Sequence, residues 1–208
     1  RHAQDAALHE PQEPPGAGYA PVEHDGWLWL SAGRPRLLGV EHESGGSSGF
    51  HDALAGALRR STWDEVFGRL TGMFVLARVR DDALEIVTDQ MRSRPAYEAT
   101  SASNGRVAGG ATLGGPLADL AGRADDYDAL SLAELLVRHC ISFPWTSRNG
   151  INELAPATIR RVRLDASGAV GHDDRSLWVP AEPDRWPGAA ELRESLGRAM
   201  REAGRDVS

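Results

Sequence analysis

The sequence has no lysine, a single cysteine and no long hydrophobic run. All 23 of its basic residues are arginine, which excludes any mechanism that needs a lysine amine, such as Schiff-base formation. One cysteine, Cys140, excludes both an internal disulfide and a cysteine-built zinc site. No apolar run approaches the ~20 residues needed to cross a bilayer. We therefore expect a chain in a reducing, cytoplasmic setting that is not a self-contained catalyst.

Positive charge is in the minority. The 208 residues carry 30 acidic and 23 basic side chains, a formal charge of −7. Nucleic acids and anionic membranes both select for concentrated positive charge, so we expect neither as the main partner. A hydrophobic content of 41% over this length is enough for one domain with a real core, or for one domain and a fragment of the next.

Proline and glycine mark the ends of the main domain. Residues 1–25 hold four prolines and little apolar content, which predicts a flexible N-terminal arm. A proline-rich link at 180–187 precedes an amphipathic helix whose apolar residues include Leu192, Leu196 and Met200. No partner element follows that helix. We therefore predict a main domain at 26–180, and a linker with the first helix of a further domain at 181–208.

The main domain shows strand patterns more often than helix patterns. Two hairpins are predicted where strand-like runs flank short polar turns, over 73–89 and 158–178. Two helices are predicted to begin at sequences with capping-box spacing. They are 62–70, which begins at Thr62, and 131–141, which begins at Ser131. Since no βαβ repeat is present, the sequence indicates an α+β fold.

Reactive side chains are few. Cys140 shares a helical face with Leu132 and Leu136, which predicts a core position, and neighbouring His139 would point about 100° away from it. The seven histidines show no metal-ligand spacing. The sequence therefore predicts no catalytic residue and no metal ligand in this chain.

The six tryptophans allow two interpretations. Trp27 and Trp29 alternate with leucines on one predicted strand, which is typical of packing on both faces of a sheet. The same pair, together with Trp63, could instead anchor an extended peptide in a groove. We list Trp27 and Trp29 as candidate substrate-binding residues on the second interpretation.

Four stretches resemble the glutaminase-type N-terminal domain of the asparagine synthetase family. Residues 70–77 match its Leu-x-Gly-x-Phe strand, and 88–97 match its Arg-Asp-x-x-Gly-x-Arg-Pro-Leu-Tyr segment, with Arg92 or Ser93 in place of the central glycine. Residues 150–157 look like its Gly-Ile-x-x-Leu-Pro-Pro-Gly, with Ala157 as the final residue. Leu177 and Trp178 are similar to its closing Tyr-Trp-x-Pro. The matching residues in the first two stretches are Gly72, Phe74, Asp89, Arg94, Pro95 and Tyr97.

The resemblance implies a fold of the N-terminal-nucleophile hydrolase type, with two stacked antiparallel sheets flanked by helices. It also makes Arg94 and Tyr97 candidate substrate-binding residues. In the family an N-terminal cysteine attacks glutamine, whereas residue 1 here is Arg1 and the glutamine-binding stretch has no counterpart. The resemblance therefore implies a degenerate domain that releases no ammonia.

Such degenerate domains occur where a substrate amine replaces ammonia, as in lasso peptide macrolactam cyclases and β-lactam synthetases. The resemblance then implies a partner synthetase domain that uses ATP and Mg²⁺, a precursor peptide and other biosynthetic proteins, with no cofactor in this chain. An asparagine synthetase, a β-lactam-synthetase-like ligase and a non-enzymatic peptide-binding module remain alternatives. A fourth alternative is an amidohydrolase that uses Cys140.

Overall fold

The computed structural model describes residues 20–40, 46–100, 107–111, 114–164, 170–178 and 188–205. The chain divides into two compact units, Arg1–Trp178 and Val179–Ser208. Most of the predicted N-terminal arm, the turn of the second predicted hairpin and the proline-rich link lie outside the described residues.

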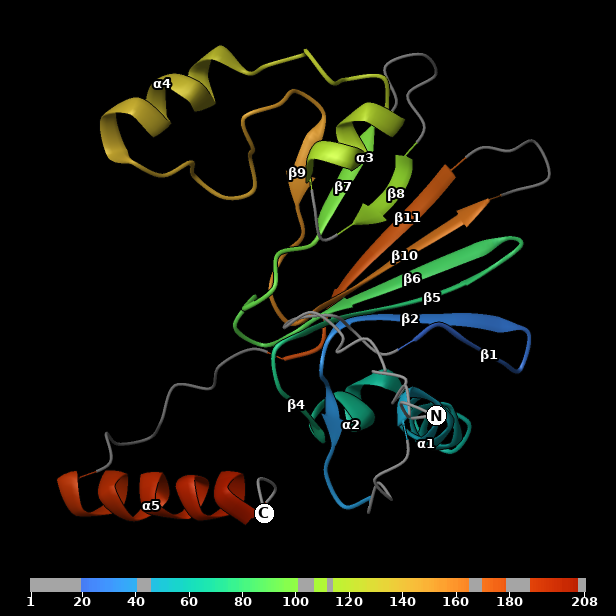
Figure 1. Ribbon diagram of the computed structural model, residues 1–208, viewed down its shortest axis with the longest axis vertical. Helices are drawn as coiled ribbons and strands as arrows, with labels where there is room; N and C mark the ends of the chain where they lie inside the picture. The colour runs from blue at the N-terminus through green and yellow to red at the C-terminus, as the bar shows by residue number, and fades with distance from the viewer. Residues whose placement is uncertain are drawn as a thin grey trace, which may run out of the picture. The chain divides into compact units, whose positions relative to one another are not determined.

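The first unit is built on a six-stranded antiparallel sheet (Figure 1). Its strand order is β1-β2-β5-β6-β10-β11, and both predicted hairpins, β5–β6 and β10–β11, are confirmed. β1 lies in residues that the sequence analysis assigned to the arm, and it pairs with β2 across a tight turn. The strands are Val22–His24 (β1), Trp27–Gly33 (β2), Phe74–Arg80 (β5), Ala83–Thr88 (β6), Thr158–Leu164 (β10) and Val170–Ser176 (β11).

Two small sheets accompany the large one. β3 (Arg36–Leu37) pairs with β4 (Leu70–Thr71), and a three-stranded sheet has the order β8-β7-β9. The three strands of the latter are Tyr97–Thr100 (β7), Val107–Ala111 (β8) and Ile151–Glu153 (β9). The α+β class is therefore confirmed, with one large antiparallel sheet and two small ones where two stacked antiparallel sheets were predicted.

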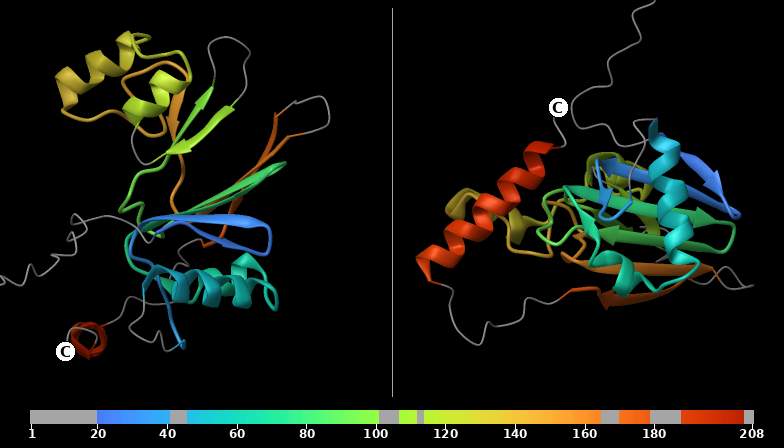
Figure 2. Two further views of the ribbon diagram at one scale, coloured as in Figure 1. Left: turned by 45° about the vertical axis from the view of Figure 1, so that its right-hand side comes forward. Right: turned by 90° about the horizontal axis from the view of Figure 1, so that it is seen from below.

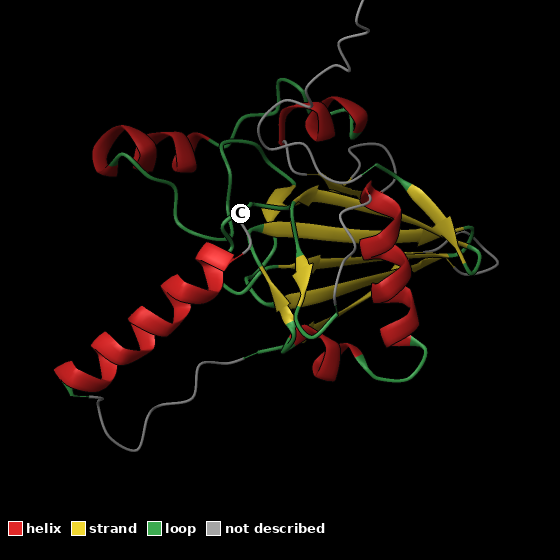
Figure 3. Cartoon of the chain, turned by 60° about the horizontal axis from the view of Figure 1, so that its bottom comes forward, coloured by secondary structure: helices red, strands yellow, loops and turns green. Residues whose placement is uncertain are grey.

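Two helices cover one face of the large sheet. α1 (Gly46–Leu58) lies across the strands, and α2 (Trp63–Phe67) follows it on the same side (Figures 2 and 3). The predicted capping box of α2 is present, because Thr62 N–H donates to Glu65 Oε2 at 3.1 Å. The main core beneath these helices includes Trp29, Leu54, Phe67, Phe74 and Ile159, each at most 1% exposed.

The remaining helices of the first unit differ from the sequence prediction. α3 (Gly114–Leu120) was not predicted, since it follows a glycine-rich stretch. α4 (Ala129–Arg138) begins earlier than predicted, because Asp128 caps it by accepting hydrogen bonds from Leu130 N–H and Ser131 N–H.

α4 also ends earlier than predicted. His139 takes a left-handed conformation at φ +59° and stops the helix, so Cys140 lies beyond it and is exposed. The prediction that Cys140 packs in a helical core is wrong, because α4 ends before it and Leu136, on the face that it was expected to share, is itself 80% exposed.

The second unit contributes one described helix, α5 (Ala189–Arg205), where an amphipathic helix was predicted. Its apolar side chains Leu192, Leu196 and Met200 are 55%, 63% and 67% exposed. Throughout the described part of the chain, every helix is too short or too polar to span a membrane.

Candidate functional site

The buried carboxylate of Asp89 organises the loop between β6 and β7. Asp89 is 1% exposed and directly follows β6. It accepts backbone hydrogen bonds from Phe74 at 3.1 Å, Met91 at 2.9 Å, Ser93 at 3.0 Å and Arg94 at 3.3 Å. Because a buried carboxylate is stable only when its oxygens are satisfied, these four donors hold the loop in one conformation. All four hydrogen bonds that Asp89 accepts come from the backbone, so its role in the described structure is to hold the loop.

Distant segments of the chain meet at the same point. Ala157 N–H donates to Asp89 O at 2.9 Å, and Leu177 N–H donates to Ala157 O at 2.7 Å. The Thr88 hydroxyl donates to Ala155 O at 2.6 Å. We name this assembly of residues 72–74, 88–97, 150–158 and 177 the Asp89 junction.

The Asp89 junction contains backbone conformations that favour glycine. Gly72 has φ +104°, and a Cβ atom there would lie 2.8 Å from Arg34 O. Arg92 and Ala157 also have positive φ values, +52° and +48°, although each has a side chain. An L-residue in this region is strained, so both positions are ones where glycine would fit more easily.

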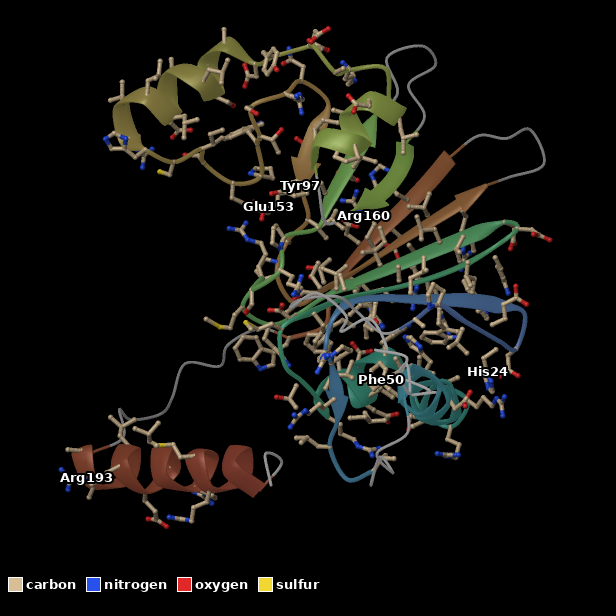
Figure 4. The ribbon with its side chains drawn as sticks, viewed as in Figure 1. His24, Phe50, Tyr97, Glu153, Arg160 and Arg193 are labelled. Atoms are coloured by element: carbon tan, nitrogen blue, oxygen red, sulfur yellow. The ribbon has the colours of Figure 1, made fainter. Side chains whose placement is uncertain are left out.

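Arg94 and Tyr97, two of the predicted site residues, belong to the Asp89 junction. The Arg94 side chain lies against β2, where a Cβ at Gly33 would be 2.7 Å from its Nε. Tyr97 pairs with Glu153 across β7 and β9, and the two side chains are close together in Figure 4. Burial raises the pKa of the Tyr97 phenol, and the Glu153 carboxylate raises it further against the opposing effect of Arg92.

Ion pairs stabilise the position of the small sheet. Arg92 pairs with Glu153 at 3.3 Å and its guanidinium stacks over the Phe143 ring at 4.8 Å. Arg160 of β10 pairs with Glu98 of β7 and thereby links the large sheet to the three-stranded one.

Trp27 and Trp29, the other predicted site residues, surround an arginine on the helix-covered side. The Arg78 guanidinium carbon lies 4.4 Å from the ring centroid of Trp27, 5.3 Å from Trp29 and 5.6 Å from Trp63. Trp29 is 1% exposed and part of the main core. A peptide groove at these tryptophans stays a prediction; the described structure has Arg78 among them.

Glu85 of β6 contacts the group formed by Arg78, Trp27, Trp29 and Trp63, which we name the tryptophan cluster. Its carboxylate accepts a hydrogen bond from the Trp63 indole at 2.9 Å and pairs with Arg78 at 2.7 Å and Arg161 at 3.0 Å. Burial alone would raise the pKa of Glu85, but Arg78, the Trp63 indole and Arg161 together hold it below its ordinary value.

A cavity of about 630 Å³ beside α4 was missed by the sequence analysis. Trp145 and Val137 line it and are 58% and 80% exposed. The Ser142 hydroxyl and N–H donate to Glu134 on its wall, and these bonds and Arg138 lower the pKa of Glu134. The only signal in the sequence was a pair of aromatic residues around Pro144 within a polar loop. The lining residues are Asp128, Leu130, Ser131, Ala133, Glu134, Val137, Arg138, Ser142 and Trp145.

No protein-family model matches this sequence, and a search of curated proteins finds no match either. Within the described ranges, no three histidine, cysteine, aspartate or glutamate side chains are grouped in a way that could hold a metal ion.

Proposed function

We propose that this chain is the glutaminase-inactive N-terminal domain of an asparagine-synthetase-like, ATP-dependent ligase that forms amide bonds. The observation that carries the proposal is the Asp89 junction. The segments that resemble the family form two groups distant in the sequence, 70–77 with 88–97 and 150–157 with 177–178, and hydrogen bonds bring the two groups together around Asp89. Unrelated chance matches would have no reason to converge on one point.

The left-handed residues of the junction support the same proposal. Arg92 and Ala157 stand where the family's motifs have glycine, and both have positive φ values. The backbone at these positions is therefore of the kind that the family's glycines allow. This also favours Arg92 over Ser93 as the counterpart of the central glycine.

The finer fold belongs to the proposal as well. We assign the large sheet and the β8-β7-β9 sheet to the two sheets of an N-terminal-nucleophile-type sandwich. In this arrangement the domain would be a scaffold for the synthetase domain and its substrate, because Cys140 is exposed after α4 and lies far along the chain from the first strand.

The chemistry would lie in the synthetase domain, which we place after the 181–208 segment. ATP and Mg²⁺ would activate a carboxylate as its adenylate with release of pyrophosphate. An amine would then displace AMP and form the amide. A lasso-type macrolactam cyclase is the favoured specific case, with asparagine synthetase and β-lactam-synthetase-like ligases as alternatives.

Two inexpensive observations test the proposal. The gene downstream of this sequence should encode a Ser-Gly-Gly-x-Asp-Ser pyrophosphate-binding loop, since its backbone N–H groups would bind phosphate at a helix start. The chain itself should release no ammonia from glutamine. Ammonia release that Cys140→Ala abolishes would instead support an amidohydrolase.

The α4 cavity favours a second candidate, a non-enzymatic peptide-binding module. Its apolar wall and the half-exposed Trp145 are typical of a groove that anchors a peptide side chain. In that case a candidate precursor peptide should change the tryptophan fluorescence of the isolated chain. Trp145→Phe should remove that change, whereas Trp178→Phe, at an exposed tryptophan outside the cavity lining, should retain it.

A further inference from the structure

Three arginines lie around the small β3–β4 sheet. Arg34 and Arg69 are exposed, and Arg94 is half-buried. Arg69 donates from Nε and Nη2 to Leu38 O, at 3.2 and 2.9 Å. Among the residues that the structure describes, none of these three guanidinium groups pairs with a carboxylate. Most other described arginines in the first unit do so, and the chain as a whole is acidic.

Exposed apolar side chains lie next to these arginines. Leu38 is 56% exposed, Met73 63% and Met91 78%. Met73 immediately precedes β5, and Met91 is in the loop that Asp89 holds. Exposure of several large apolar side chains together marks an interaction surface more often than a solvent-facing one.

Hydrogen bonds and backbone contacts bring together the segments that carry these six residues. Leu38 N–H donates to Arg69 O at 2.8 Å on the β3–β4 pair. The Gln90 amide donates to Leu70 O of β4 at 3.2 Å, which attaches the Met91 loop to the same sheet. A Cβ atom at Gly33 would meet both Arg94 Nε and Met73 O, so the Arg94 side chain and the Met73 backbone lie together beside the end of β2. We name this set the Arg–Met surface: Arg34, Leu38, Arg69, Met73, Met91 and Arg94.

We propose that the Arg–Met surface docks an acidic polypeptide segment that also carries apolar side chains. Charge complementarity selects the occupant, because none of the three guanidinium groups has a carboxylate partner among the described residues, and guanidinium groups form strong charge-assisted hydrogen bonds to carboxylates. The apolar residues favour a polypeptide over a phosphate-rich ligand, which would leave Leu38, Met73 and Met91 in water. Arginine and methionine are also enriched at the centres of protein interfaces. The inference does not rest on the proposed ligase activity, and each could fail without the other.

The test uses the full chain and a fluorescein-labelled twelve-residue peptide with four glutamates, four leucines and four serines. Fluorescence anisotropy should show binding that weakens as salt is added, since the contacts are partly ionic. Peptides with glutamine in place of glutamate, or with serine in place of leucine, should bind about tenfold more weakly. Failure of the first peptide to bind, or equal binding of all three, would overturn the proposal.

Variants locate the binding. Arg34→Glu, at an exposed position, and Met91→Ser should each weaken binding about tenfold, whereas Arg163→Glu on the exposed part of β10 should leave it within about twofold. Thermal unfolding followed by circular dichroism should show that each variant is folded. Unchanged binding by both folded variants would contradict the assignment of the site. If a twelve-nucleotide single-stranded DNA binds more tightly than the acidic peptide, the partner is a nucleic acid and the proposal is overturned.

Discussion

Four described residues other than glycine have a positive φ: Asp25, Arg92, His139 and Ala157. An L-residue in the left-handed conformation destabilises the folded state by roughly 1–2 kcal/mol. Each of these positions is therefore strained unless its side chain makes contacts that offset this free energy. Asp25 lies in the β1–β2 turn, where the following Gly26 shares the left-handed geometry. Arg92 gains its pairing with Glu153, and the Ala157 methyl is buried. His139 is exposed, so its side chain makes the fewest contacts that could offset the strain.

His139→Gly should therefore stabilise the protein. Glycine at the end of a helix removes the left-handed strain, but it also raises the conformational entropy of the unfolded chain, which opposes folding. The free energy of unfolding should rise by about 0.5–1 kcal/mol as the net result. Urea denaturation measures it. The matched control, Val137→Gly at an exposed position inside α4, should lower the free energy of unfolding by about 0.5 kcal/mol. Destabilisation by both changes would contradict the left-handed end of α4.

We expect Asp89→Asn to lower the free energy of unfolding far more than such a small chemical change suggests. The amide group offers one oxygen where two accept now, and it turns a donor toward buried N–H groups, so we expect a loss of about 3 kcal/mol. Asp82→Asn, at an exposed hairpin pair with Arg80, should cost less than about 0.5 kcal/mol. Equal losses in chemical denaturation would mean that Asp89 does not hold the loop.

The elements that sequence reasoning predicts well are those with long regular patterns. The β5–β6 and β10–β11 hairpins have six or seven residues a strand, and α5 has seventeen. β1 and β9 have three residues each, too few for an apolar periodicity to appear. Pairing with β2 and β7 forms them, which is information from distant parts of the chain.

Helix boundaries depended on which cap the backbone uses. Ser131 and Glu134 have capping-box spacing, yet Asp128 provides the cap three residues earlier. For the candidate site, Arg94 and Tyr97 were found through a motif, whereas Trp145 beside the α4 cavity was not. The exposure of Trp145 is set by tertiary structure, and a single residue in a loop has no sequence periodicity that could predict it.

Asp128→Ala should lower the free energy of unfolding by about 1 kcal/mol, because α4 loses the acceptor for its first N–H groups. Asp125→Ala, at an exposed position before the helix, should change it by less than about 0.5 kcal/mol. Thermal denaturation of the two variants compares them directly. A larger effect from Asp125 would place the start of the helix elsewhere.

The pH dependence of the tryptophan cluster follows from Glu85. Its pKa lies below the ordinary value of 4.5, so its ionised form stabilises the fold above that pH, and this contribution is lost as the pH falls through the folded-state pKa. Between pH 7 and pH 3, the free energy of unfolding should fall more steeply in the wild type than in Glu85→Gln. Urea midpoints across this range provide the comparison, and parallel curves for the two proteins would contradict the role given to Glu85.

At the scale of the whole molecule, a first unit with an extensive hydrogen-bonded framework is followed by a helix with an exposed apolar stripe. The Asp89 junction orders the first unit without using a reactive group. The α5 stripe has the amphipathic pattern of a helix that packs on a partner. Both features fit the proposal that the chain is the scaffold domain of a larger ligase.

The most direct test of that proposal is AMP release by this chain together with the synthetase domain that we expect downstream. AMP and an amide should form together when ATP, Mg²⁺, a carboxylate and an amine are supplied. Cys140→Ala should leave this activity unchanged. Absence of AMP with every carboxylate and amine tried, or loss of the activity in Cys140→Ala, would contradict the proposed role as the scaffold domain of a ligase.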